Sequence, residues 1–189
     1  LLDASKMPGN SLRVDLFGQA GHCSVYHHPG YIIIGEPPVD GGVIFCGSFC
    51  PFHQGHQDIV DYLTERYPVT LNICLHHPEK GFVDLISLHD RLATLKLPVT
   101  LDNASRFVDK VLIYPGSKFA VGADTFERLQ KYNYTMAEYE ILHRTKFIVF
   151  ERDCEIKDIL GLDYVVASIK PTSISSTEIR RGDSLPFSD

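Results

Sequence analysis

Two histidines, His53 and His56, flank Gln54 and Gly55 just after an apolar run, in the segment IFCGSFCPFHQGHQDIV at residues 44–60. Imidazoles near the start of a helix can donate hydrogen bonds to phosphate oxygens, where free N–H groups and the helix dipole already attract anions. If that phosphate is under attack, two fixed donors stabilise the charge that builds on its oxygens. The spacing therefore predicts a site for phosphoryl or nucleotidyl transfer without a covalent step on the protein.

Two other interpretations compete for this pair. A metalloprotease helix places its histidines four residues apart with a glutamate between them, whereas this pair is three apart and encloses Gln54 and Gly55. We therefore expect no metal site formed by these side chains. A purely structural turn remains an alternative for the motif taken alone.

A second segment of interest is SISSTEIRRGD at residues 173–183. Its hydroxyls at 175–177 stand in front of Glu178, which is typical of a capped helix start. Such a helix start could hold the outer phosphates of a nucleotide, and Arg180, one turn later, could pair with them through its forked donors. An ordinary capping box on a surface helix is the alternative for this segment in isolation.

The elements that must position these residues alternate regularly from residue 43 onward. Near-continuously apolar strands are expected at 43–45, 69–75, 97–103, 118–124, 146–152 and 163–169, and helices at 57–66, 85–95, 105–115, 125–132 and 135–144. This succession predicts a single α/β domain, a Rossmann-like doubly wound parallel sheet. In such sheets ligands bind at the carboxyl ends of the strands, and the His53 loop lies at one such end.

The first 40 residues do not follow that rhythm. They are rich in proline and glycine, with one strong strand candidate at residues 31–35. We interpret residues 1–40 as an extension that adds an edge strand or hairpin, or as the tail of a missing upstream domain, and residues 41–189 as the α/β domain.

Composition narrows the function classes. The net charge of -6, from 18 basic and 24 acidic residues, disfavours nucleic acid as a partner. Five scattered cysteines indicate free thiols in a reducing compartment, so we expect a cytoplasmic protein. No apolar run approaches the ~18 to 20 residues of a membrane span. The start LLDASKMPG has no initiator Met and no leader pattern, so we expect a fragment or trimmed chain rather than a secreted precursor.

The two motifs together resemble a known group of enzymes. GSFxPxHxGH at residues 47–56 and ISSTEIR at 174–180 are similar to the motifs of the nucleotidyltransferase superfamily that includes nicotinamide and nicotinate mononucleotide adenylyltransferases. FAVGADTFERL at 119–129 resembles the segment of that family in which a glycine and an aspartate, here Gly122 and Asp124, approach the adenosine. The resemblance covers about residues 42 to 183.

This resemblance implies a reaction and a set of residues. A small phosphorylated acceptor, such as nicotinamide or nicotinate mononucleotide in NAD biosynthesis, would attack the α-phosphate of ATP and release pyrophosphate, with Mg²⁺ accompanying ATP. His53 and His56 would stabilise the transition state and Arg180 would hold the outer phosphates. The implied nucleotide contacts are Gly47, Ser48, Phe49, Gly55, Gly122, Asp124, Ser175, Ser176 and Thr177.

One departure from the family pattern concerns the acceptor. The enzymes that make the dinucleotide generally stack the pyridine ring on a tryptophan, and this chain has none. Tyr132, Asn133 and Tyr134 occupy that neighbourhood, so we expect stacking there instead. The chain resembles a divergent plant and bacterial branch, often attached to another domain. The alternative function is a non-catalytic nucleotide-binding sensor or accessory domain; a tRNA synthetase fragment is disfavoured because no KMSKS-like lysine loop is present.

Overall fold

The structure is a computed structural model, and it describes residues 25–28, 31–35, 38–77, 81–152, 154–170, 176–182 and 186–187. Its strands are β1 Val25–His28, β2 Tyr31–Gly35, β3 Val43–Cys46, β4 Val69–Cys74, β5 His76–His77, β6 Gly81–Phe82, β7 Val99–Asp102, β8 Lys118–Gly122, β9 Lys146–Phe150 and β10 Asp163–Val166. Its helices are α1 Gln54–Thr64, α2 Leu85–Thr94, α3 Phe107–Ile113, α4 Ala123–Leu129, α5 Met136–His143 and α6 Ser176–Arg181.

Eight of the described strands form one sheet in the order β1-β2-β7-β4-β3-β8-β9-β10. The six strands from β7 to β10 are parallel, whereas β1 and β2 are antiparallel to their neighbours. The chain builds outward from β3 through β4 to β7, then returns to place β8 on the other side of β3. The predicted doubly wound parallel sheet is confirmed, and its switch point lies between β3 and β8.

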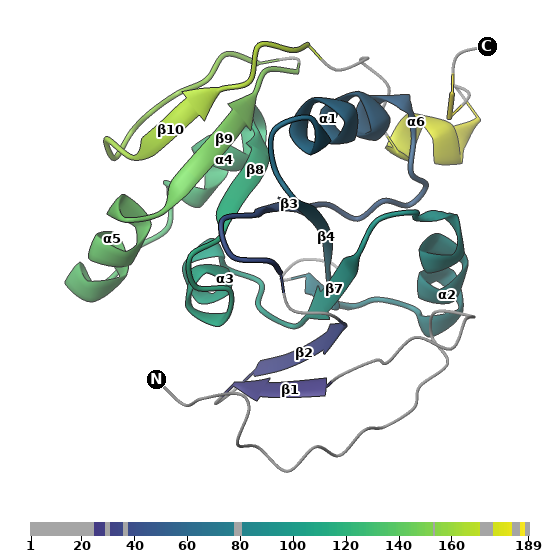
Figure 1. The fold of residues 1–189 in the computed structure, drawn as a ribbon, viewed down its shortest axis with the longest axis horizontal. Coiled ribbons are helices and arrows are strands. Elements are labelled where there is room, and N and C mark those ends of the chain that lie inside the picture. Colours follow the sequence, from purple (N-terminus) through teal and green to yellow (C-terminus); the bar gives the residue numbers. More distant parts are fainter. Residues whose placement is uncertain are drawn as a thin grey trace.

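Helices cover both faces of this sheet. Figure 1 shows α1 and α2 on one side and α3, α4 and α5 on the other. On the first face Leu63 of α1 and Leu88 of α2 are fully buried, and on the second Phe126 of α4 and Leu142 of α5 are fully buried. Each helix therefore buries one apolar stripe against the alternating side chains of the parallel strands.

The expectation of near-continuous apolar strands is wrong for β4 and β7. Both strands place apolar residues toward α1 and α2, but Thr70, Asn72, Thr100 and Asp102 alternate with them and are buried on the opposite face. The apolar side chains of these strands pack into the core on one face. The buried polar side chains on the other face need hydrogen-bond partners inside the protein.

Residues 31–35 form the expected strand, β2, which lies between β1 at the edge of the sheet and β7. β1 and β2 make an antiparallel hairpin, and β2 pairs with β7; residues 1–24 lie outside the described part. Some helix starts differ from expectation: α1 begins at Gln54 rather than 57, and α4 begins at Ala123 rather than 125, with Gly122 as its N-cap. No described helix is long and apolar enough to cross a membrane.

Candidate active site

The segments that carry His53 and Gly122 meet at the switch point of the sheet. β3 ends at Cys46 and leads through the Gly47 loop into α1, while β8 ends at Gly122 and leads into α4. Since β3 and β8 are adjacent and parallel, their two loops diverge and leave a crevice between the starts of α1 and α4.

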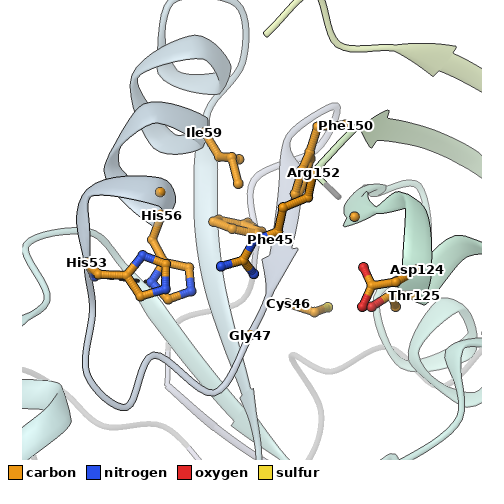
Figure 2. Close-up of a pocket in the computed structure, with 12 residues that line it drawn as sticks. Phe45, Cys46, Gly47, His53, His56, Ile59, Asp124, Thr125, Phe150 and Arg152 are labelled. Carbon is orange, nitrogen blue, oxygen red and sulfur yellow. Dashed lines mark hydrogen bonds between the residues drawn. The ribbon is translucent and has the colours of Figure 1, made fainter. Parts of the chain in front are cut away.

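A cavity of about 160 Å³ occupies this crevice. It is lined by Phe45, Cys46, Gly47, His53, Gly55, His56, Ile59, Gly122, Asp124, Thr125, Phe150 and Arg152. Six of the residues expected from the sequence are thus brought together around one space: Gly47, His53, Gly55, His56, Gly122 and Asp124. Figure 2 shows the histidines on one side of it and Asp124 with Thr125 on the other.

The two histidines form a stacked pair at the start of α1. His53 is the N-cap residue and His56 is the third residue of the helix. Their ring centroids are 3.7 Å apart with 23° between the planes, and the main-chain N–H of His53 donates to Nδ1 of His56 over 3.2 Å. Only 1% of His53 is exposed, and within the described part of the chain neither of its ring nitrogens has a hydrogen-bond partner. A buried polar ring without partners indicates a place for a ligand atom.

Both rings are neutral in this environment. Burial, with Arg152 adding to its effect and Asp58 and Glu178 opposing it, lowers the pKa of His53 to about 4. Burial lowers the pKa of His56 to about 3, with His53 and Arg152 contributing. Since low polarity and positive charge both disfavour the imidazolium form, each ring has one N–H to donate near neutral pH.

The Gly47 loop is shaped by Phe49. A Cβ added to Gly47 would lie 2.8 Å from the Phe49 ring, so only glycine fits there. The Phe49 ring is fully buried, with centroid distances of 5.0 Å to His56 and 5.3 Å to Phe45. The Phe49 side chain packs beneath His56 as part of the core and does not line the described cavity. Its contact with a bound nucleotide stays a prediction.

Ser48 is exposed and does not line the cavity, although it belongs to the same loop. Its carbonyl oxygen accepts a hydrogen bond of 3.2 Å from Arg91 of α2, which also donates to Ser87. Arg91 thus reaches the His53 loop from the neighbouring helix α2.

The second half of the crevice is formed by the start of α4. Gly122 caps the helix, and a Cβ added to it would lie 2.8 Å from Oδ1 of Asp124 and 3.4 Å from the Phe150 ring. Glycine at this position therefore leaves room for the Asp124 carboxylate, which is exposed at the cavity.

Sequence reasoning missed Arg152. It lies two residues after the end of β9, at the carboxyl end of the strand next to β8, and it lines the cavity. Figure 2 shows its side chain reaching between the histidine pair and Asp124. The available signal was its position, since a charged residue immediately after a buried strand of a parallel sheet faces the ligand edge. Phe150, the last residue of β9, forms an apolar wall of the cavity.

The carboxyl-terminal motif docks on the His53 loop. Arg180 of α6 donates through Nη1 to the carbonyl oxygen of Cys50, and the main-chain N–H of Gln54 donates to the carbonyl oxygen of Pro186 over 2.7 Å. The two motifs therefore lie together as expected, although they are more than 120 residues apart. Ser175 lies outside the described residues, and the side chains of Ser176 and Thr177 are not described, so their phosphate contacts stay predictions.

The expected stacking residues lie away from the cavity. Tyr132 and Tyr134 have ring centroids 6.3 Å apart, and Tyr134 packs on Tyr139 of α5 at 5.5 Å. Neither they nor Asn133 line the described cavity, whose aromatic walls are Phe45 and Phe150. Stacking of an acceptor ring on Tyr132 or Tyr134 stays a prediction.

Comparison with protein families decides the class of the protein. The family model described as cytidylyltransferase-like matches residues 44–182. This chain belongs to the cytidylyltransferase-like family. As a member it is a nucleotidyltransferase, which confirms the resemblance drawn from the two motifs.

Solved structures agree on the fold. The chain is similar to Plasmodium falciparum nicotinic acid mononucleotide adenylyltransferase complexed with NaAD, with 17% identity over 76% of this chain and 83% of that chain and a TM-score of 0.55. The same enzyme complexed with APC matches at 17% identity over the same shares, with a TM-score of 0.51. A search of curated proteins finds no match.

Proposed function

We propose that this cytidylyltransferase-like protein transfers the adenylyl group of ATP to a small phosphorylated acceptor, with release of pyrophosphate. The observation that carries the proposal is the stacked pair His53 and His56 at the start of α1, facing the same cavity as Asp124 of α4. Two neutral imidazoles beside a helix N-terminus suit an α-phosphate whose negative charge grows as the acceptor attacks.

His56 is the better placed of the two donors. Its Nδ1 accepts a hydrogen bond from the His53 main chain, so the neutral ring carries its proton on Nε2. That N–H is held in a fixed direction before the substrate arrives, and a preorganised donor costs no reorganisation during the reaction. His53, buried and without ring partners among the described residues, supplies the second donor.

Two arginine side chains lie at or beside the same cavity. Arg152 lines the cavity, and Arg180 reaches the adjacent loop at Cys50. In the proposed complex Arg152 neutralises charge near the α-phosphate, while Arg180 and the start of α6 bind the β- and γ-phosphates. No acid or base on the protein is required, because the phosphate of the acceptor is itself the nucleophile and pyrophosphate is the leaving group.

Mg²⁺ fits this site as part of the nucleotide substrate. Asp124 is the only carboxylate among the described residues that line the cavity, and no described group of three His, Cys, Asp or Glu side chains could hold a metal ion by itself. Mg²⁺ is usually held by one or two carboxylates together with substrate phosphates, so Asp124 and the triphosphate would hold it. When bound, Mg²⁺ offsets charge on the phosphates.

The acceptor proposed is a mononucleotide such as nicotinate or nicotinamide mononucleotide. This proposal is supported by the similarity to the Plasmodium falciparum enzyme, a nicotinic acid mononucleotide adenylyltransferase. In this chain Phe45 and Phe150, with ring centroids 5.9 Å apart, offer the apolar wall against which a flat base or pyridine ring can pack.

Pyrophosphate release tests the proposal. Purified protein is incubated with ATP, Mg²⁺ and each member of a panel of acceptors: nicotinate mononucleotide, nicotinamide mononucleotide and other phosphorylated cofactor precursors. We expect release with at least one acceptor and none without acceptor. Folded protein that ATP stabilises against heat, but that releases no pyrophosphate with any acceptor, would instead support the nucleotide-binding sensor.

A further inference from the structure

A buried polar cluster lies on the second face of the sheet, close to the cavity but outside it. Asn72 of β4, Asp102 of β7, and Lys110 and Tyr114 at the end of α3 all have at most 4% of their surface exposed. Asn72 and Asp102 lie near the carboxyl ends of their strands, and the adjacent Cys46 of β3 lines the cavity.

The cluster is closed by short contacts. Nζ of Lys110 lies 2.8 Å from Oδ1 of Asp102 and 2.8 Å from Oδ1 of Asn72. Nδ2 of Asn72 donates to Oδ2 of Asp102 over 2.7 Å, and the Tyr114 hydroxyl donates to the same oxygen over 2.7 Å. Burial disfavours the charged form of Lys110. The charge of Asp102, with Cys46, Cys74 and the hydrogen bond to Asp102 adding to its effect, nevertheless leaves the pKa of Lys110 above its usual value.

Net stability does not explain such a cluster. Taking a lysine and an aspartate out of water costs several kcal/mol for each ion, and a buried pair seldom returns more than that cost. Apolar side chains of similar volume, like those that fill the first face of β4 and β7, would serve the core as well. A buried ion pair instead fixes one arrangement of the segments that it joins.

The segments joined here are the strand ends that carry the site. The main-chain N–H of Gly47 donates to the carbonyl oxygen of Asn72 over 3.1 Å, which extends the β3–β4 ladder into the loop. The carbonyl oxygen of Asp102 accepts from Leu75 over 2.6 Å, and its Oδ1 accepts from the main-chain N–H of Ala104 over 3.0 Å. The cluster therefore holds the ends of β4 and β7 in position. Through Asn72 it also holds the start of the Gly47 loop.

We propose that Lys110, Asp102 and Asn72 form a positioning network that holds the Gly47 loop in the conformation that binds the substrate phosphates. None of the three lines the cavity, so they act through Gly47 rather than by touching a ligand. The contribution to ligand binding rests on the proposed function, whereas the anchoring of Gly47 can be measured in the free protein.

The test combines two measurements on three variants. Lys110→Met/Asp102→Asn removes both charges together and so avoids a lone buried charge. Asn72→Ala is a milder second variant, because it keeps the ion pair and the carbonyl oxygen that accepts from Gly47. Gln130→Met is the matched control: Gln130 is also buried and joins segments, through Ile159, Leu160 and Lys157, but these lie away from the cavity.

The first measurement is hydrogen exchange of the Gly47 amide in free protein, well below each melting temperature. We expect exchange about tenfold faster in the double variant and a smaller increase in Asn72→Ala, with no change in Gln130→Met. The second is the dissociation constant for ATP with Mg²⁺, expected to rise about tenfold in the double variant and to stay at the wild-type value in Gln130→Met.

The outcomes separate the two proposals. Unchanged Gly47 exchange in a folded double variant overturns the positioning network, as does an equal effect in Gln130→Met, which would make the cluster merely structural. Faster exchange with unchanged ATP affinity also overturns it, because the anchored loop would then not serve the ligand. If wild-type protein binds no nucleotide while Gly47 exchange still responds as expected, the anchoring stands and the proposed function fails.

Discussion

His53 and His56 are joined by a main-chain hydrogen bond of 3.2 Å from His53 to Nδ1 of His56, beneath a ring stack with centroids 3.7 Å apart. This arrangement assigns the His56 proton to Nε2, and burial, with Arg152 adding to its effect, keeps both rings neutral. A bound phosphate should raise the pKa of these rings, since its negative charge favours the imidazolium form.

Nucleotide binding should therefore take up protons. A nearby anion raises a pKa by about 1–3 units, which would bring that of His53 from about 4 to near 6 in the complex. At pH 6 we expect an uptake on the order of half a proton on ATP binding, measured by calorimetry in buffers of different ionisation enthalpy. His89→Gln, a change at an exposed histidine of α2, should leave the uptake unchanged, whereas His53→Gln should reduce it. Heats that do not depend on the buffer would contradict this account.

Acid should destabilise the free protein through the same pair. Both pKa values are lowered in the folded state, to about 4 and about 3, whereas the unfolded chain takes up protons near pH 6.5. The pair's contribution is therefore full above pH 6.5 and is lost as the pH falls toward 4, by up to about 1.4 kcal/mol per pH unit for each ring. Urea unfolding at pH 7 and pH 5 should show a smaller loss in His53→Gln than in wild type. Equal losses would mean that His53 does not carry this pH dependence.

Arg152 should affect both the pKa values of the two histidines and the affinity for ATP. In Arg152→Met the pKa values of His53 and His56 should rise, because a neighbouring positive charge is removed. ATP affinity should fall about 10- to 100-fold, the range expected for loss of a charged hydrogen-bond donor. Arg144→Met, at the end of α5 and exposed, removes the same charge outside the cavity. Equal losses of ATP affinity in the two variants would mean that only the net charge of the protein matters, and not the position of Arg152 in the cavity.

Phe49 should behave as a core residue rather than a ligand contact. Its ring is fully buried against Phe45, Phe52 and His56, so Phe49→Ala should lower the free energy of unfolding by about 3–5 kcal/mol. Chemical unfolding measures this loss. Phe49→Leu, which keeps most of the volume, should lose less than half as much. A Phe49→Ala protein of wild-type stability with impaired ATP binding would restore the role first expected from the sequence.

The sequence predicts most of the fold because its periodicity is clear where helices and strands alternate. It also predicts the meeting of Gly47, His53, Gly122 and Asp124, since their motifs follow adjacent strands of a parallel sheet. It does not predict the burial of Phe49, because a phenylalanine in a glycine-rich loop carries no signal of direction. That ring lies inward against Gly47 and Phe45, and these contacts depend on the tertiary fold.

Two further features could not be predicted from the sequence, for different reasons. Arg152 was read as the end of a strand, and its place in the site depends on β9 lying next to β8. The cluster of Asn72, Asp102 and Lys110 brings together residues from two strands and a helix, so no local pattern marks it. Such contacts depend on tertiary pairing, which propensity and periodicity do not encode.

In the proposed reaction His53 and His56 act on the α-phosphate of ATP. The most direct measurement follows label from ATP carrying ³²P at the α-position, with Mg²⁺ and the acceptor that releases pyrophosphate. We predict that the label appears in an adenylylated acceptor, and that His56→Ala lowers the rate by at least about 100-fold with less than about threefold change in ATP affinity. Label that remains entirely in unreacted ATP, or a loss in His56→Ala that affects binding and rate equally, would contradict the account.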